Sequence, residues 1–249
     1  MKKKFLLPLL GTALTSLVLV SCGMKKITYE EAKVIYSQAL EVVKAEDYKE
    51  ANSFEVRVDT IFINNEENLD VKRTYRYDTL KNYCYFYEDY KNNVKKTNTK
   101  EESYIYVKDG YYYDYWTDFT KTVATKKIFD SSVEFKDTID EDLAIDLKNT
   151  IIGNYVFGSM LLAEIEKYKL SIEYLSSGEG SLSIASDNTV DDEDGNKIRN
   201  LFEVEINNYE MNRFHELRSA EEATRDIDVH YAYNLNVVSY LDEKLFTTK

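Results

Sequence analysis

The sequence has few residues of the types that interrupt secondary structure, form disulfides or commonly act in catalysis. Its 249 residues include one proline, eight glycines, two cysteines and two histidines. Two cysteines cannot form a framework of disulfides, so stability has to come from packing. Because the one proline is Pro8, no proline-rich linker interrupts the rest of the chain, and we expect a single domain over residues 28–249.

Few side chains or motifs in the sequence are typical of a catalytic site. The two histidines, His215 and His230, lie in segments that read as strands or their edges, where an exposed or hydrogen-bonded histidine is usual. The sequence has no Gly-x-Ser-x-Gly elbow, no His/Cys spacing typical of zinc and no glycine loop for phosphate. We therefore expect a protein that is not an enzyme and needs no cofactor.

A metal site is not expected either. The acidic segment 191–195 ends in glycine and resembles part of a calcium loop. An EF-hand requires an oxygen ligand five residues before that glycine and a bidentate glutamate six residues after it. Those positions hold Val190 and Leu201, so we expect residues 186–197 to be a solvated acidic loop.

Basic residues are scarce relative to acidic ones. The chain has 32 lysines and arginines against 45 acidic residues, a net charge of −13. If residues 1–21 are removed with their three lysines, 29 basic residues remain and the charge becomes −16. Such a protein is repelled by phosphate backbones and anionic headgroups, so we exclude nucleic acid as a partner and expect a monomer held in solution.

The N-terminus has the form of an export signal. Three lysines at positions 2–4 precede an apolar run over residues 5–20, which ends in Leu19-Val20-Ser21-Cys22. This order resembles a bacterial lipobox, and the resemblance implies removal of residues 1–21, acyl chains on Cys22 and a short tether to residue 27. The expected location is thus the extracytoplasmic side of a cell membrane, with a lipid anchor. The alternative is an ordinary cleaved signal with a chance cysteine.

The second cysteine then has no partner within the chain. Cys84 lies among aromatic residues in Tyr83-Cys84-Tyr85-Phe86-Tyr87. A free cysteine in apolar surroundings behaves as a small hydrophobe. We therefore expect Cys84 to be buried rather than reactive.

Hydrophobic periodicity predicts a helix followed by antiparallel strands. Thr28-Tyr29-Glu30-Glu31 is a capping box, and apolar residues at helical spacing follow it to about residue 48. The pattern then alternates with period two, and Asp109-Gly110 is a strong hairpin signal. The expected strands are 54–62, 69–77, 83–87, 103–107, 111–116 and 122–128, with a polar stretch over 88–102.

A second helical region and a second meander complete the chain. Thr138-Ile139-Asp140-Glu141 is another capping box, and residues 139–168 read as a pair of helices broken at Gly153. Strands are expected at 170–175, 180–185, 199–207, 209–217 and 227–240.

This order of elements is similar to the lipoprotein-carrier superfamily, which includes periplasmic lipoprotein localisation factors and mycobacterial lipoprotein relatives. The helix before the first strand, the segment 106–111 and the helical insertion 139–168 support the likeness. It implies an α+β fold in which a curved antiparallel sheet, an incomplete barrel, is covered on its concave side by the N-terminal helix and the inserted helical pair. A flat-sheet α+β domain is the main alternative.

Tyrosine is the most distinctive feature. Twelve of the 22 tyrosines lie between Tyr75 and Tyr115, mostly two residues apart, so that each strand has an aromatic stripe. Tyrosine has high strand propensity, so the stripes favour a sheet that covers helix 28–48; the alternative is that they form walls for a ligand. The candidate ligand contacts are Tyr83, Tyr85, Tyr87, Tyr104, Tyr106, Tyr111, Tyr113, Trp116, Phe157, Leu161 and Ile165.

Two functions agree with these observations. The first is a membrane-anchored lipoprotein that binds lipid or another apolar ligand between the sheet and helices 139–168. The second is a surface-exposed module that contacts protein or glycan and has no internal cavity. Consecutive residues of a strand point to opposite faces, so Tyr111-Tyr112-Tyr113 must divide between core and surface.

Overall fold

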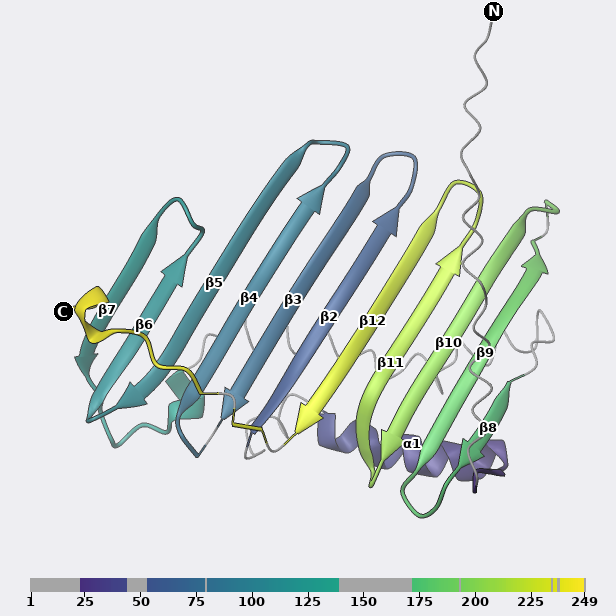
Figure 1. Cartoon of the computed structure of the whole chain (residues 1–249), viewed down its shortest axis with the longest axis horizontal. Coiled ribbons are helices and arrows are strands. Elements are labelled where there is room, and N and C mark those ends of the chain that lie inside the picture. Colours follow the sequence, from purple (N-terminus) through teal and green to yellow (C-terminus); the bar gives the residue numbers. More distant parts are fainter. Residues whose placement is uncertain are drawn as a thin grey trace, which may run out of the picture.

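The computed structural model of the chain describes residues 23–43, 53–78, 80–138, 172–192, 194–233, 235–236 and 238–248. Within these ranges thirteen strands form one sheet, and a single α-helix lies across it (Figure 1). The predicted signal, Cys22 and the predicted helices 139–168 lie outside the described residues. No helix within the described ranges is long and apolar enough to cross a membrane.

The helix, α1 (Tyr29–Val43), begins at the predicted capping box. The backbone N–H of Thr28 donates to the Glu31 carboxylate at 2.8 Å, and the Glu31 N–H donates to the Thr28 hydroxyl at 3.2 Å. These two bonds satisfy donors that the first turn leaves without a helical partner. The predicted extension to residue 48 lies outside the described residues. The buried side of α1 carries Ala32, Tyr36 and Ala39.

The first meander has six antiparallel strands. They are β2 (Ser53–Ile63), β3 (Asn68–Asp78), β4 (Tyr83–Asn92), β5 (Thr97–Lys108), β6 (Tyr111–Thr117) and β7 (Thr122–Ile128). Asp109 and Gly110 join β5 to β6 with φ values of 51° and 79°. Positive φ at both positions matches the twist of a hairpin, and glycine adopts it without a Cβ clash. The predicted meander is confirmed.

The second meander lies beside the first. Its strands are β8 (Glu173–Ser176), β9 (Leu182–Asp191), β10 (Lys197–Asn207), β11 (Glu210–Ser219) and β12 (Thr224–Tyr233). Two short strands end the sheet: β1 (Lys25–Lys26) pairs with β8, and β13 (Thr247–Thr248) pairs in parallel with β7. The 3-10 helices are η1 (Phe135–Thr138) and η2 (Glu243–Leu245).

The two meanders join where β12 pairs with β2. Val229 and Tyr231 of β12 align with Val58 and Val56 of β2, so one apolar face continues from meander to meander. The strand order runs from β1 to β13 without closing. The predicted α+β fold, an incomplete barrel with a helical pair over its concave side, is therefore wrong: the protein is one large, mostly antiparallel sheet with one α-helix among its described residues.

The core lies on one face of the sheet, which we call the helix face. There α1 packs mainly on β9, β10 and β11, and Figure 1 shows it behind their lower ends. The interpretation that tyrosine-rich strands cover this helix is wrong, because β4–β6 lie several strands away. Cys84 is also on the helix face and is 3% exposed, as predicted, and burial raises the pKa of its thiol to about 12. We call the opposite face the outer face.

Several strand ends differ from the prediction. Residues 88–102 are not a polar connection, since they complete β4 and begin β5, and residues 186–191 complete β9. Cross-strand ion pairs stabilise these segments, with Lys100 Nζ 3.1 Å from Asp89 and Arg199 Nη2 2.8 Å from Asp187. In contrast, the strand predicted over 227–240 ends at residue 233.

Candidate binding site

Three candidate tyrosines form one row on the outer face. Tyr83, Tyr106 and Tyr113 are direct cross-strand neighbours on β4, β5 and β6. The Tyr106 and Tyr113 rings stack with centroids 4.7 Å apart, and the Phe246 ring packs edge-on against Tyr113 at 5.0 Å. We call these four buried rings the aromatic cluster. The C-terminal residues 238–248 lie over it (Figure 1), so the chain itself covers these rings.

A carboxylate organises the next row. The Tyr85 and Tyr104 hydroxyls donate to one oxygen of Glu102 at 3.1 and 3.0 Å. Burial raises the pKa of both hydroxyls, and the Glu102 charge raises it further. Burial also raises the pKa of Tyr83 and of Tyr106 to about 12. Tyrosine is protonated at neutral pH even at its ordinary pKa of about 10, so all four hydroxyls are neutral hydrogen-bonding groups there.

The remaining candidates are not brought together. Tyr87 is half-buried on the outer face, at the border of a groove described below. Tyr111 is exposed, with the Lys126 ammonium 5.2 Å from its ring centroid, while Tyr112 is buried on the helix face, so the predicted alternation between faces is confirmed. The expectation of an open surface on the other face is wrong at Tyr113, which Phe246 covers. Trp116 is half-buried and shares the face of Tyr112. Phe157, Leu161, Ile165 and Cys22 lie outside the described residues.

Next to the tyrosines, the outer face of β2 and β3 has a fixed ion-pair network. Glu55 is 7% exposed, and its two oxygens accept from Arg57 Nε at 2.6 Å and from Arg76 Nε at 2.5 Å. The Arg76 guanidinium also lies 4.9 Å from the Tyr85 ring centroid. Two guanidinium groups on one carboxylate leave a local positive charge and restrict all three side chains.

A second network lies on β10–β12. Arg213 donates to both oxygens of Asp228 at 2.9 Å and lies 3.0 Å from Glu203. The two ring nitrogens of His215 are 3.0 Å from Glu203 and 2.9 Å from Asp226. Burial by itself would lower the pKa of His215. The hydrogen bonds to Asp226 and Glu203 have the opposite and larger effect, so the pKa is raised overall. An imidazole that faces carboxylates through both nitrogens is stabilised as a cation.

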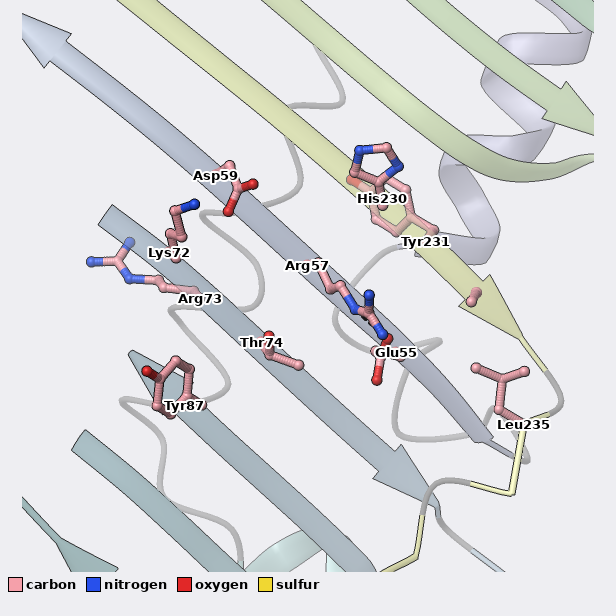
Figure 2. Close-up of a pocket in the computed structure, with 11 residues that line it drawn as sticks. Glu55, Arg57, Asp59, Lys72, Arg73, Thr74, Tyr87, His230, Tyr231 and Leu235 are labelled. Carbon is pink, nitrogen blue, oxygen red and sulfur yellow. Dashed lines mark hydrogen bonds and ion pairs between the residues drawn. The ribbon is translucent and has the colours of Figure 1, made fainter. Parts of the chain in front are cut away.

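An open groove of about 650 Å³ lies between these networks (Figure 2). Tyr87, Thr74, Arg57 and His230 form a row across β4, β3, β2 and β12, each opposite the next in register. The neighbouring row contributes Asp59 and Lys72, and Leu235 borders one end. The volume is in the range of small-ligand sites. Charged and polar side chains on central strands thus line the groove.

Two cations in the groove have unused hydrogen-bond donors. The Arg57 side chain is 62% exposed, and its Nε bonds to Glu55, while its terminal N–H groups have no partner among the described residues. Lys72 is exposed and has Asp59 and Asp89 as cross-strand neighbours, but no carboxylate of the described residues lies within 4 Å of its ammonium. Beside them, His230 is half-exposed, with Nε2 3.3 Å from Asp228. These donors are available to a ligand.

Sequence reasoning missed this groove, although a signal was present. Glu55, Arg57 and Asp59 alternate along β2 with buried apolar residues, so charges at period two mark the outward side of the strand. The pairing of β12 with β2, which places His230 beside Arg57, cannot be read from that alternation. Among the candidates that lie in the described ranges, Tyr87 alone lines the groove.

Metal binding finds no support in the described residues, since no three histidine, cysteine or carboxylate side chains are grouped to hold an ion. In the acidic turn, Asp192 instead accepts the backbone N–H groups of Asp194 and Asn196 at 2.9 and 2.7 Å. The carboxylate is thus used to close the turn, as turn aspartates commonly are.

No protein-family model matches this chain, and no curated protein matches it. A function for the groove therefore has to follow from its own charges, exposure and shape. Its fixed donors and acceptors are typical of a binding surface.

Proposed function

We propose that this chain is an extracytoplasmic lipoprotein that binds a polar ligand in the groove of its outer face. The observation that supports binding is the row of polar side chains across β4, β3, β2 and β12. Glu55 restricts Arg57 and Arg76 before any ligand arrives. Side chains that are already restricted lose less entropy on binding, which favours affinity.

The anchoring part of the proposal is supported by the sequence. The basic start, the apolar run 5–20 and the residues Leu19-Val20-Ser21-Cys22 resemble a lipobox signal. Two or more acyl chains on Cys22 give stable membrane attachment, where a single chain is marginal. The net charge, −13 for the whole chain and −16 without residues 1–21, keeps the domain away from anionic headgroups.

A polar ligand fits the described residues better than an apolar one. The expected lipid site needed helices 139–168, which lie outside the described residues. The apolar surface of β4–β6 is filled by Phe246 of the same chain, and five of the eleven residues that line the groove are charged. Of the two functions expected from sequence, we therefore prefer the surface interaction module.

Metabolic labelling with an alkyne analogue of palmitate tests the anchor. The full-length chain is expressed in bacteria, and we expect label in the membrane fraction. The Cys22→Ser variant should lose the label and leave the membrane. Equal labelling of the variant would show that the anchor is not at Cys22.

An array of defined saccharides and peptides tests binding in the groove. The full chain in detergent is compared with the Arg57→Ala, His230→Ala double variant and with Lys95→Gln, an exposed lysine in the turn after β4. We expect any binding to weaken more than about tenfold in the double variant, since hydrogen bonds to charged groups are lost. Binding that survives in the double variant, or no binding to the array, would refute the proposal.

A further inference from the structure

The charges in the groove favour an anionic ligand that also carries hydroxyl groups. Arg57 and Lys72 have unused donors, and Glu55 is already neutralised by two arginines. On a protein whose net charge is −13, or −16 without residues 1–21, the three cations Arg57, Arg76 and Lys72 exceed the two carboxylates Glu55 and Asp59 by one positive charge. Asp59 is also exposed in the groove. Its carboxylate repels a plain polyanion but accepts hydrogen bonds from hydroxyl groups.

The row of side chains has the length of a short oligosaccharide rather than of one small ion. Tyr87 and His230 are separated by three strand spacings, roughly 14 Å. Tyr87 supplies an aromatic ring at one end, and Arg57 supplies free guanidinium donors two strands away. Figure 2 shows these residues on one side of the sheet, with Thr74 between them. An aromatic ring packs against the apolar face of a sugar ring, and the planar polar groups pair with its substituents.

The position of the groove argues against an extended peptide. Peptides that bind sheets commonly add a strand at an edge, where backbone N–H and C=O groups are unpaired. The groove instead lies on β12, β2, β3 and β4, which pair with neighbours on both sides. A peptide there would find few partners for its own backbone, whereas a saccharide presents hydroxyl groups that side chains can satisfy.

We propose that the groove binds an acidic saccharide, with its carboxylate on Arg57 and Lys72 and a sugar ring against Tyr87. This inference rests on the proposed function, because it names the chemical class of the polar ligand. It assigns charge recognition to β2 and β3 and ring recognition to β4.

Matched pairs of oligosaccharides test this inference by calorimetry with the full chain in detergent. The probes carry galacturonate, glucuronate or sialate, and each is compared with its carboxyl methyl ester, which keeps the sugar and removes the charge. We expect at least one acid to bind about tenfold more tightly than its ester, as for hydrogen bonds to a charged group. A pentaglutamate peptide serves as an acidic ligand without sugar rings and should not compete.

Two variants and a control test which side chains contact the saccharide. Lys72→Gln should weaken binding of the acid about fivefold and leave ester binding unchanged, because Lys72 contributes charge from an exposed position. Tyr87→Leu should weaken acid and ester alike. Lys95→Gln makes the same charge change outside the groove and should have no effect. Circular dichroism confirms that each variant is folded.

The outcomes separate this inference from the function on which it rests. Equal affinity for acids and esters, lost in Tyr87→Leu, would overturn the acidic class and leave a polar-ligand site. Tighter binding of pentaglutamate than of every saccharide would identify an acidic peptide and overturn the saccharide. No binding of any probe would count against both proposals.

Discussion

Two halves of the outer face are stabilised in different ways. On β4–β6 many outward residues are tyrosines, and the C-terminal residues 238–248 cover Tyr83, Tyr106 and Tyr113. On β10–β12 and β2–β3 the outward residues are charged and pair across strands, and a groove remains open. Both halves show the same period-two alternation, so periodicity alone does not decide which half is covered. The chemistry of the outward residues does.

The difference follows from solvation. A ring gains free energy when it leaves water, about 25 cal/mol for each Å² of apolar surface buried. An exposed ion pair gains little, since water already solvates both charges. The aromatic half therefore recruits a covering segment, whereas the charged half keeps its surface available.

Removal of the Phe246 ring should have the largest effect. Phe246 is 8% exposed and contacts Tyr106 and Tyr113. Truncation of a buried phenylalanine leaves a cavity, so Phe246→Ala should lower the free energy of unfolding by about 3 kcal/mol. Urea unfolding monitored by tyrosine fluorescence measures the loss. Leu245→Ala, at a neighbouring residue that is 52% exposed, should change it by less than about 0.5 kcal/mol. Equal effects of the two would show that the covering segment does not stabilise the aromatic half.

Loss of the buried charge in the groove should have an intermediate effect. Glu55→Gln leaves Arg57 and Arg76 without their carboxylate at a position that is 7% exposed. Breaking a fully buried pair costs about 3–5 kcal/mol, but the arginines are partly solvated, so we expect about 1.5 kcal/mol. Thermal unfolding compares it with Glu66→Gln in the exposed turn after β2, which should be neutral. If both variants were neutral, the groove would not be preorganised.

His215 should make the stability of the charged half depend on pH. Its pKa is raised in the folded protein, with Glu203 and Asp226 at its nitrogens and Arg213 and Asp228 nearby. The stabilisation is therefore fully present below the unfolded pKa of about 6.5 and is lost as pH rises through the folded pKa. Melting temperatures between pH 5 and pH 9 should converge with those of His215→Asn at high pH. A His215→Asn variant that kept the wild-type pH profile would show that another group is responsible.

Local features could be predicted well from the sequence. The capping box at Thr28, the hairpin at Asp109-Gly110 and the burial of Cys84 each depend on residues close in the chain or on one physical preference. The alignment of tyrosines across β4, β5 and β6 follows from their spacing once the hairpins are fixed.

Long-range features could not be predicted. The pairing of β12 with β2 joins residues far apart in the sequence, and it makes one sheet of the two meanders. The cover over the tyrosines comes from Phe246, which no local pattern distinguishes. Charged strand ends were predicted as loops, because the residue that pairs with each charge lies on the neighbouring strand and not beside it in the sequence.

Asp187 gives the smallest effect and the sharpest test of that last point. It lies in a segment predicted as an acidic loop, yet on β9 it accepts two hydrogen bonds from Arg199 at 2.8 and 2.9 Å. The hydrogen bond from Arg199 lowers the pKa of Asp187, so its stabilisation is present at neutral pH and lost as pH falls through the folded pKa. Because both side chains are substantially exposed, Asp187→Asn should cost only about 0.5 kcal/mol at low salt and less at 1 M salt, where the Debye length is about 3 Å. Asp194→Asn, the same change in the turn that follows, should cost nothing. If 1 M salt does not reduce this loss of stability, packing rather than charge pairing stabilises β9. The contrast between the aromatic half and the charged half of the outer face would then not extend to this strand.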